Sequence, residues 1–271
     1  MRRETLLLFL RKELRDLKAN RQVWPAYLLL PAIAVLLPVL LLALLPVFLD
    51  PALAGHDPGA DMLRQTIAND ATLAGATLAE RLARYLLREL GVFYLLMPVI
   101  LASTGAALAL VREKEQRTLE PILATPLRDR DLLLAKLLAS VGPALLVTWS
   151  AFVPGVLAGG LCGWWRVGRV ILPTAGNLVG VLLLAPAMAA VAALLGLRVS
   201  ARFTDVPGAM QFTGLLVIPA SLILVAVLGR PAMAHPGLGL AGAALLALAA
   251  SGLFARTVRK FRREELLTRW K

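Results

Sequence analysis

The chain has 271 residues, of which 59% are hydrophobic and 17% are charged, and its formal net charge is +12. A soluble domain of this length could not bury so much apolar surface, so the composition excludes an ordinary soluble fold and indicates an integral membrane protein. Membrane topology and contact with anionic lipid head groups explain the positive charge, and we expect no nucleic-acid partner.

Charged residues divide the chain into six long apolar stretches. A helix needs about 20 apolar residues to cross a hydrocarbon core about 30 Å thick. Leucine, alanine and valine dominate each stretch, which favours helices over the short alternating strands of a membrane barrel. We therefore expect an all-α membrane protein with a single six-helix transmembrane domain over residues 23–271. The expected spans are Val23–Leu49, Leu90–Val111, Leu137–Trp165, Val170–Leu197, Val206–Gly229 and Pro231–Ala255.

The N-terminal segment, residues 1–22, has leucines at helical spacing on one side and basic residues on the other. This pattern predicts an amphipathic helix that lies in the cytoplasmic interface of the membrane, and a plain basic anchor is the alternative. The apolar run that follows is too long for the hydrophobic region of a signal peptide, so we expect it to be the first span.

Residues 50–89 form the one sizeable predicted outer loop, which is too small for a separate domain. Proline and glycine predict irregular chain in its first part. These residues are Pro51, Gly55, Pro58 and Gly59. Leucines at every fourth position then predict a helix that continues into the second span. They are Leu78, Leu82, Leu86 and Leu90.

The distribution of Lys and Arg predicts the orientation, because basic flanks are retained in the cytoplasm. Most of the 29 basic residues lie in four segments that one orientation places on the same side. We therefore expect a multi-pass protein of the inner (plasma) membrane with both termini in the cytoplasm. The cytoplasmic segments would be residues 1–22, 112–136, 198–205 and 256–271. Trp164 and Trp165 would then lie in the outer aromatic belt.

The segment 112–136 is densely charged and lies between two predicted spans. Mixed charges cannot lie in hydrocarbon, so this segment must protrude from the membrane. Leu119, Ile122 and Leu123 share one helical face with charges around it, which is typical of a short helix that docks in a groove of a partner. A solvated surface loop is the alternative.

Motifs for chemistry are missing from the sequence. It has no GxxxxGK[ST] loop, no HExxH, no GxSxG and no cysteine cluster, since Cys162 is the single cysteine. The interiors of the six predicted spans contain no charged residue or histidine, whereas ion-driven carriers place such groups at mid-membrane. We therefore expect no catalytic, cofactor-binding or metal site on this chain, and a carrier of this kind needs energy from a partner.

At the charged segment the chain resembles a known family. Residues 113–126, E-K-E-Q-R-T-L-E-P-I-L-A-T-P, are similar to the E-x-E-x-G-T-L-E-x-L-L-x-T-P signature of type-2 ABC transporter permeases, including sodium-efflux and multidrug exporters. Residues 11–14 resemble the K-E-L of the entry helix in those proteins, and residues 200–211 resemble their second cytoplasmic loop. Arg117 stands where the signature has Gly, and the outer loop is smaller than in several sodium-efflux relatives.

The resemblance implies a permease subunit of an ATP-driven exporter, worked by a separate cytoplasmic ABC ATPase that binds ATP and magnesium. Segment 112–136 would carry the coupling helix, with Glu113, Glu115 and Glu120 providing charge complementarity to the ATPase. The implied coupling residues are Glu113, Glu115, Thr118, Leu119, Glu120, Ile122, Leu123 and Pro126. A second permease copy or a homologue, together with membrane lipids, would complete the set of partners.

Two alternatives to an ATP-driven exporter stay open. One is a membrane scaffold or assembly factor that has the permease fold but transports nothing, and the other is an ion-coupled carrier. For an exporter, the apolar spans suit a hydrophobic or amphipathic cargo, but a polar path is also conceivable. Its candidate residues are Ser103, Thr104, Thr148, Asn177, Gln211 and Thr213.

Overall fold

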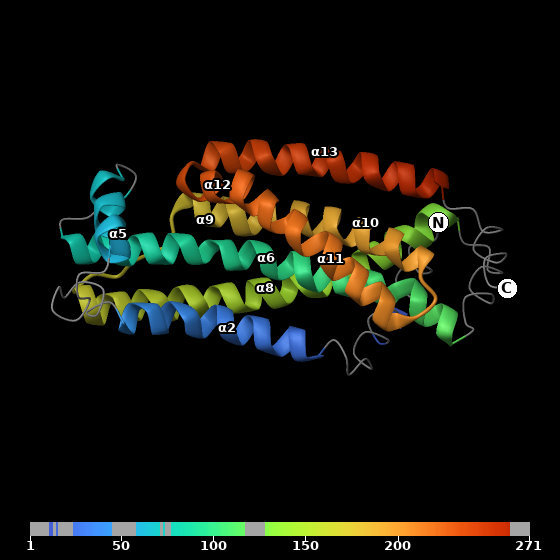
Figure 1. Ribbon diagram of the computed structural model, residues 1–271, viewed down its shortest axis with the longest axis horizontal. Helices are drawn as coiled ribbons and strands as arrows, with labels where there is room; N and C mark the ends of the chain where they lie inside the picture. The colour runs from blue at the N-terminus through green and yellow to red at the C-terminus, as the bar shows by residue number, and fades with distance from the viewer. Residues whose placement is uncertain are drawn as a thin grey trace.

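The computed structural model describes residues 11–12, 15, 24–44, 58–70, 73, 77–116 and 128–260. These residues form helices and short connections, and no strand occurs among them. Six helical stretches are long and apolar enough to cross a membrane. They run in alternating directions, side by side, in one elongated bundle (Figure 1). The predicted all-α fold with six spans is confirmed.

The first three spans are α2 (Trp24–Ala43), α6 (Leu78–Glu115) and α8 (Asp129–Val167). The fourth joins α9 (Ala175–Val179), a π-helical turn η1 (Gly180–Leu184) and α10 (Ala185–Arg202). The fifth joins α11 (Val206–Leu224), a second π-helical turn η2 (Val225–Gly229) and α12 (Arg230–Ala234). The sixth is α13 (Pro236–Lys260), and α5 (Pro58–Asn69) is a short helix outside the spans.

The two ends of the bundle differ, and we name them by their contents. The lysine end carries Lys12, Lys114 and Lys136, and the α5 end is the opposite one, where α5 lies (Figure 1). Helices α6 and α8 are about 57 to 59 Å long at 1.5 Å per residue, well beyond the hydrocarbon thickness of about 30 Å. Both therefore extend into the predicted loop 112–136, which is helical as far as Glu115 and again from Asp129.

Helix α6 is the central helix of the bundle, and it contacts α2, α8, α10 and α11. Small side chains allow its close packing with α10, as is common between membrane helices. A Cβ added to Gly196 in α10 would lie 2.6 Å from the backbone oxygen of Ser103 in α6, so only glycine permits this approach. Buried alanines fill the rest of the contact, among them Ala102, Ala106, Ala189 and Ala193.

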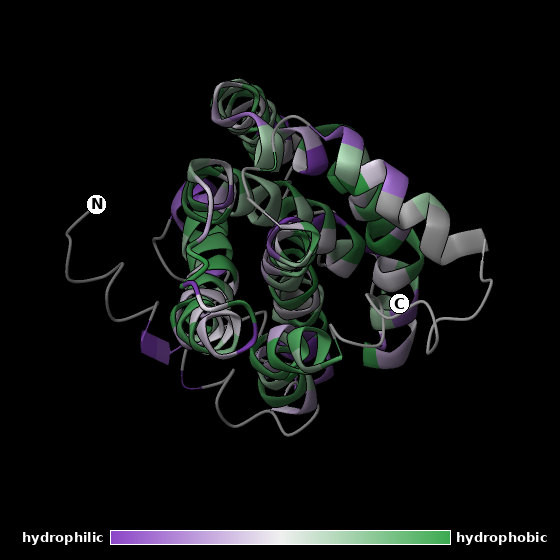
Figure 2. Ribbon diagram, turned by 90° about the vertical axis from the view of Figure 1, so that its left-hand side faces the viewer, coloured by the Kyte–Doolittle hydropathy of each residue, from purple (hydrophilic) through white to green (hydrophobic). Residues whose placement is uncertain are grey.

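Apolar side chains also cover the outside of the bundle. Figure 2, a view along the bundle from the α5 end, shows apolar residues along the spans and hydrophilic residues gathered toward their ends. Exposed leucines are expected on helices that face lipid rather than water. Examples are Leu146, Leu157, Leu215 and Leu248. Trp164 and Trp165 are exposed near the end of α8, where an aromatic belt is expected.

The first part of the predicted outer loop differs from the prediction. The sequence predicts irregular chain at Pro58 and Gly59, but these residues form the first turn of α5. Proline fixes φ near −65° and suits the first helical positions, which explains why a helix begins there. The predicted irregular residues Pro51 and Gly55 lie outside the described residues.

The second part of that loop agrees with the prediction. Helix α6 begins at Leu78 and continues without interruption into the second span. Thr77 caps it, because its hydroxyl accepts a hydrogen bond from the backbone N–H of Glu80 at 3.2 Å. An N-cap of this type satisfies one of the free N–H groups at the start of a helix.

Candidate functional site at the lysine end

The last turn of α6 links several helices at the lysine end. Glu113, Lys114 and Glu115 follow one another, and successive positions on a helix point about 100° apart. Each side chain therefore reaches a different neighbour. This turn is the first part of the predicted coupling segment 112–136, of which the structure describes residues 112–116 and 128–136.

Glu113 makes the buried contact of this group. Its side chain is 6% exposed, and its Oε1 lies 2.8 Å from Lys136 Nζ and 3.1 Å from Lys12 Nζ. Lys136, in α8, is fully buried and also donates a hydrogen bond to the Ala109 carbonyl at 3.0 Å. A buried charge is tolerated only when a partner and hydrogen bonds offset its lost hydration. The pair therefore joins α6 to α8, and Lys12 adds the N-terminal segment.

Lys114 holds the end of α10. Its Nζ donates hydrogen bonds to the carbonyls of Ser200, Ala201 and Phe203 at 3.2, 2.8 and 2.9 Å. The last carbonyls of a helix lack partners within the helix and carry its partial negative charge, so an ammonium group stabilises them. The hydroxyl of Ser200 also accepts a hydrogen bond from the N–H of Val111 at 3.1 Å.

Glu115 reaches the start of α11. Its Oε1 accepts a hydrogen bond from the N–H of Val206 at 3.0 Å, and the N-cap residue Asp205 accepts one from Gly208 at 2.7 Å. Two carboxylates thus lie at the partly positive N-terminus of α11. The connection between α10 and α11 has three residues, Phe203 to Asp205. Helix α6 contacts both α10 and α11, the helices before and after this connection.

The structure revises the prediction for Glu113. We expected its carboxylate to contribute charge complementarity to a partner, but it is buried and binds two lysines of this chain. Its role in coupling stays a prediction. Glu115 is exposed and partly engaged by Val206. The other predicted coupling residues lie outside the described residues, and their role stays a prediction: Thr118, Leu119, Glu120, Ile122, Leu123 and Pro126.

Sequence reasoning missed Lys136 as a site residue and treated it as a basic flank of the third span. A helical pattern could have found it. Leu132, Leu133 and Ser140 are all buried, and Lys136 lies at helical spacing between them on the same face. A lysine on the apolar face of a helix requires a carboxylate partner. The neighbouring run Glu113-Lys-Glu115 supplies it.

Comparison with known families decides the class of this protein. A sequence model of the ABC-2 family transporter proteins matches residues 65–251, which is more than half of the chain. The match extends from α5 into α13 and so contains the whole lysine-end network except Lys12. The chain belongs to the ABC-2 transporter family. Neither curated proteins nor solved structures give a match to the chain.

As a member of the ABC-2 family, the protein is a multi-pass membrane permease of an ABC transporter. Membership implies that the protein associates with an ABC ATPase and that the permease itself is normally not catalytic. In the part of the chain that the structure describes, no three His, Cys, Asp or Glu side chains are placed to hold a metal ion.

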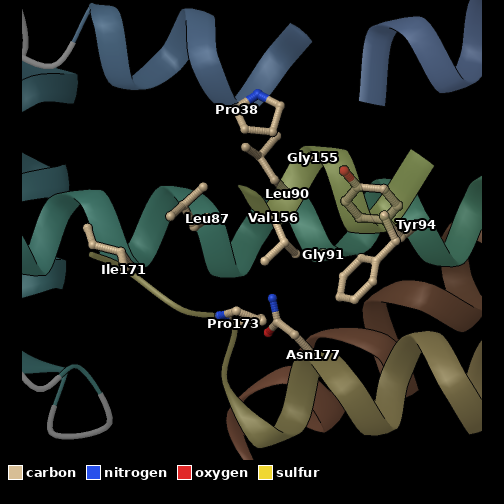
Figure 3. Close-up of a pocket in the computed structure, with 11 residues that line it drawn as sticks. Pro38, Leu87, Leu90, Gly91, Tyr94, Gly155, Val156, Ile171, Pro173 and Asn177 are labelled. Carbon is tan, nitrogen blue, oxygen red and sulfur yellow. The ribbon is translucent and has the colours of Figure 1, made fainter. Parts of the chain in front are cut away.

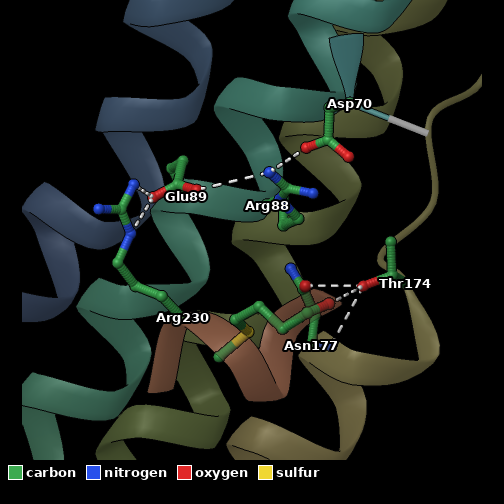
Figure 4. Close-up of polar contacts among 7 residues, drawn as sticks. Asp70, Arg88, Glu89, Thr174, Asn177 and Arg230 are labelled. Atoms are coloured by element: carbon green, nitrogen blue, oxygen red, sulfur yellow. Dashed lines mark hydrogen bonds and ion pairs between the residues drawn. The ribbon is translucent and has the colours of Figure 1, made fainter. Parts of the chain in front are cut away.

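The α5 end of this ABC-2 permease carries a second charged network (Figure 4). Arg88 lies 2.9 Å from Asp70 and 3.7 Å from Glu89, and Arg230 lies 2.9 Å from Glu89. These contacts join α6 to the residue after α5 and to α12. Arg230 is 56% exposed, so its pair with Glu89 is a surface contact, unlike the pair of Glu113 and Lys136.

Three residues of the candidate polar path donate hydrogen bonds within their own helices. Ser103 and Thr104 both donate to the Ile100 carbonyl, and Thr148 donates to the Ala144 carbonyl. Such bonds use the hydrogen of each hydroxyl and leave its oxygen able to accept a hydrogen bond. Asn177 differs from these three residues, because its side chain lies in a cavity wall.

Proposed function

We propose that this ABC-2 permease is the membrane subunit of an ATP-driven exporter, in which a separate cytoplasmic ATPase moves the spans by acting on the segment between α6 and α8. The lysine-end network is the observation that carries the proposal. A partner that pushed on this segment would act on α6, and α6 is joined to α8, α10 and α11 by charged side chains.

The geometry of the network suggests how the movement is shared. Within the predicted coupling segment 112–136, α6 ends at Glu115 and α8 begins at Asp129. Glu113 and Lys136 join these two helices, so α6 and α8 would move together rather than separate. Lys114 and Glu115 would carry the same movement to the α10–α11 connection. This is a rigid-body transition of packed helices, which is one common form of switching.

We infer that the lysine end faces the cytoplasm and that both termini lie there. Basic residues cluster at this end. Anionic lipids of the cytoplasmic leaflet attract such residues, and the positive-inside rule places them in the cytoplasm. An ATPase that binds soluble ATP could reach the coupling segment only on that side.

We also propose that two permease subunits, either identical or homologous, form the transport unit. Three spans, α2, α11 and α13, are mostly exposed in the single chain and present apolar side chains outward. These faces can be covered by lipid or by a second permease subunit. Because this chain supplies six spans, a second subunit would supply the other half of the transport unit.

Co-purification with an ABC ATPase tests this proposal directly. Leu119→Asp and Glu120→Lys in the coupling segment should each abolish ATPase binding and the stimulation of ATP hydrolysis, because an apolar anchor or a complementary charge is lost. Met62→Asp is the matched control, since Met62 is 72% exposed in α5 at the opposite end. Unchanged ATPase binding and stimulation in both coupling variants would reject the proposed coupling. Binding without movement of cargo would instead support a scaffold.

A further inference from the structure

The two cavities at the α5 end are small. The one lined by residues of α2, α6, α8 and α9 has a volume of about 30 Å³ (Figure 3), and the one beside Arg88 has about 80 Å³. A water molecule takes up about 30 Å³ of the liquid. Each cavity therefore has room for water, whereas the outer faces of the spans have room for a larger partner.

Gln211 is a polar side chain on an outer face, in α11. Two other exposed polar side chains on the spans, Ser150 and Ser251, donate hydrogen bonds to the Val147 and Leu248 carbonyls of their own helices at 2.9 and 2.8 Å. Gln211 makes no hydrogen bond to any residue that the structure describes. Its amide has N–H donors and a carbonyl acceptor, and lipid tails can satisfy neither.

The position of Gln211 along the fifth span places it within the membrane. The charged residues Asp205 and Arg230 lie toward the two ends of this span. At about 1.5 Å per residue, Gln211 lies about 9 Å beyond Asp205, and Arg230 lies about 37 Å beyond it. The hydrocarbon core is about 30 Å thick, so with both charges outside the core Gln211 lies inside it. A polar side chain at such a position is usually hydrogen-bonded to another helix.

The same face of α11 permits another helix to approach closely. Gly214 follows Gln211 by almost one turn, and a Cβ added there would meet only Ile218 Cδ1, at an ordinary contact distance of 3.8 Å. Packing within this chain therefore does not require glycine at residue 214, whereas small residues are typical of contacts between membrane helices. Leu215 is 75% exposed, more than any other large apolar side chain that the structure describes.

We propose that two copies of this chain pair through the outer face of α11, with Gln211 of one copy hydrogen-bonded to Gln211 of the other. The inference rests on the proposed pairing of two subunits and names its surface. Both copies have the same orientation in the membrane, so the two-fold axis is parallel to the membrane normal and identical residues lie at the same depth. An amide both donates and accepts hydrogen bonds, so it is complementary to itself.

This pairing surface adjoins the lysine-end network. Glu115 accepts a hydrogen bond from the N–H of Val206, the first residue of α11, at 3.0 Å. Gln211 lies about 7.5 Å further along the same helix. A movement of α6 in one copy would therefore reach the pairing surface directly, and the coupling segments of the two copies would act together.

Disulfide crosslinking in native membranes tests the surface. Single cysteines are placed in the full chain with Cys162→Ser, which removes its one natural cysteine. Under oxidation by copper phenanthroline, we expect covalent dimers from Gln211→Cys and Leu215→Cys. The matched controls Leu28→Cys in α2 and Ser251→Cys in α13 lie at exposed positions of the other two mostly exposed spans and should stay monomeric.

Co-isolation of two differently tagged copies measures the strength of the pairing. Gln211→Leu should raise the dissociation constant about fivefold, because the hydrogen bonds between the copies are lost. Gly214→Leu should raise it by about tenfold or more, because the larger side chain holds the two helices apart. Ser251→Leu, a matched polar-to-apolar change in α13, should have no effect. Equal elution volumes and melting temperatures of the separated subunits establish that the variants are folded.

The outcomes separate this inference from the proposed function. Copies that associate but crosslink through Leu28→Cys or Ser251→Cys overturn the α11 surface and leave the pairing of two subunits intact. Reaction of Gln211→Cys with a membrane-impermeant maleimide, without dimer formation, also overturns it, because the side chain then faces water. Identical copies that do not associate overturn the inference and leave pairing with a homologue as the remaining form of the transport unit.

Discussion

Both ends of the bundle are rich in charge, but they use it differently. At the lysine end, three successive residues of α6 bind the ends of other spans through buried or capping contacts. At the α5 end, ion pairs such as Glu89 with Arg230 are more exposed, and a cavity of about 80 Å³ lies beside Arg88 and Asn177. Paired buried charge joins the helices at the first end, whereas more exposed ion pairs join them less strongly at the second.

The largest effect is expected from breaking the buried pair at the lysine end. Lys136→Met leaves the carboxylate of Glu113 without its buried partner, and breaking such a pair costs about 3 to 5 kcal/mol. We expect a clear drop in the melting temperature of the purified protein. Adding Glu113→Gln to this variant should restore part of the loss, because the buried negative charge is then also removed. A melting temperature equal to the wild-type value would show that the pair is not buried as described.

A smaller effect is expected from releasing the end of α10. Lys114→Met removes one ammonium group that donates to three terminal carbonyls, and a positive charge at the end of a helix contributes about 0.3 to 2 kcal/mol, because water can solvate the carbonyls in its place. We expect faster hydrogen exchange in the last turn of α10 and little change in α13. Arg256→Met, at an exposed position of α13, is the control. Equal exchange in both variants would contradict the capping role of Lys114.

The smallest effect is expected at the α5 end. Arg230→Gln removes an ion pair with Glu89 that is largely solvated, and such pairs contribute about 0 to 1 kcal/mol. The melting temperature should therefore shift by only a degree or two, and high salt should shift the wild type by a similar amount because it screens the pair. A loss as large as that of Lys136→Met would remove the distinction between the two ends.

Hydropathy alone predicted six spans, and the structure confirms them because length and apolar composition decide whether a helix can cross a membrane. The leucine spacing also predicted that the helix beginning at Leu78 enters the second span. The charged segment after it carried the resemblance to type-2 ABC permeases, and the family match confirms that class. These features are local or periodic, so neighbours in space were not needed to find them.

Pairing of side chains could not be predicted in the same way. Lys136 follows Glu113 by more than twenty positions, and only the packing of α6 against α8 brings their charges to 2.8 Å. The same packing places Glu113 inside the bundle, where the sequence suggested a surface charge. At the other end, one small cavity combines residues from α2, α6, α8 and α9, among them Asn177.

The sequence by itself determined that this protein spans a membrane six times and which segment emerges between the second and third spans, because these properties follow from runs of apolar and charged residues. The tertiary structure alone decided which charges are buried against one another and which stay exposed. These outcomes depend on distances between helices that are far apart in the chain, and a buried charge or donor is stabilised only by the group that lies directly opposite it.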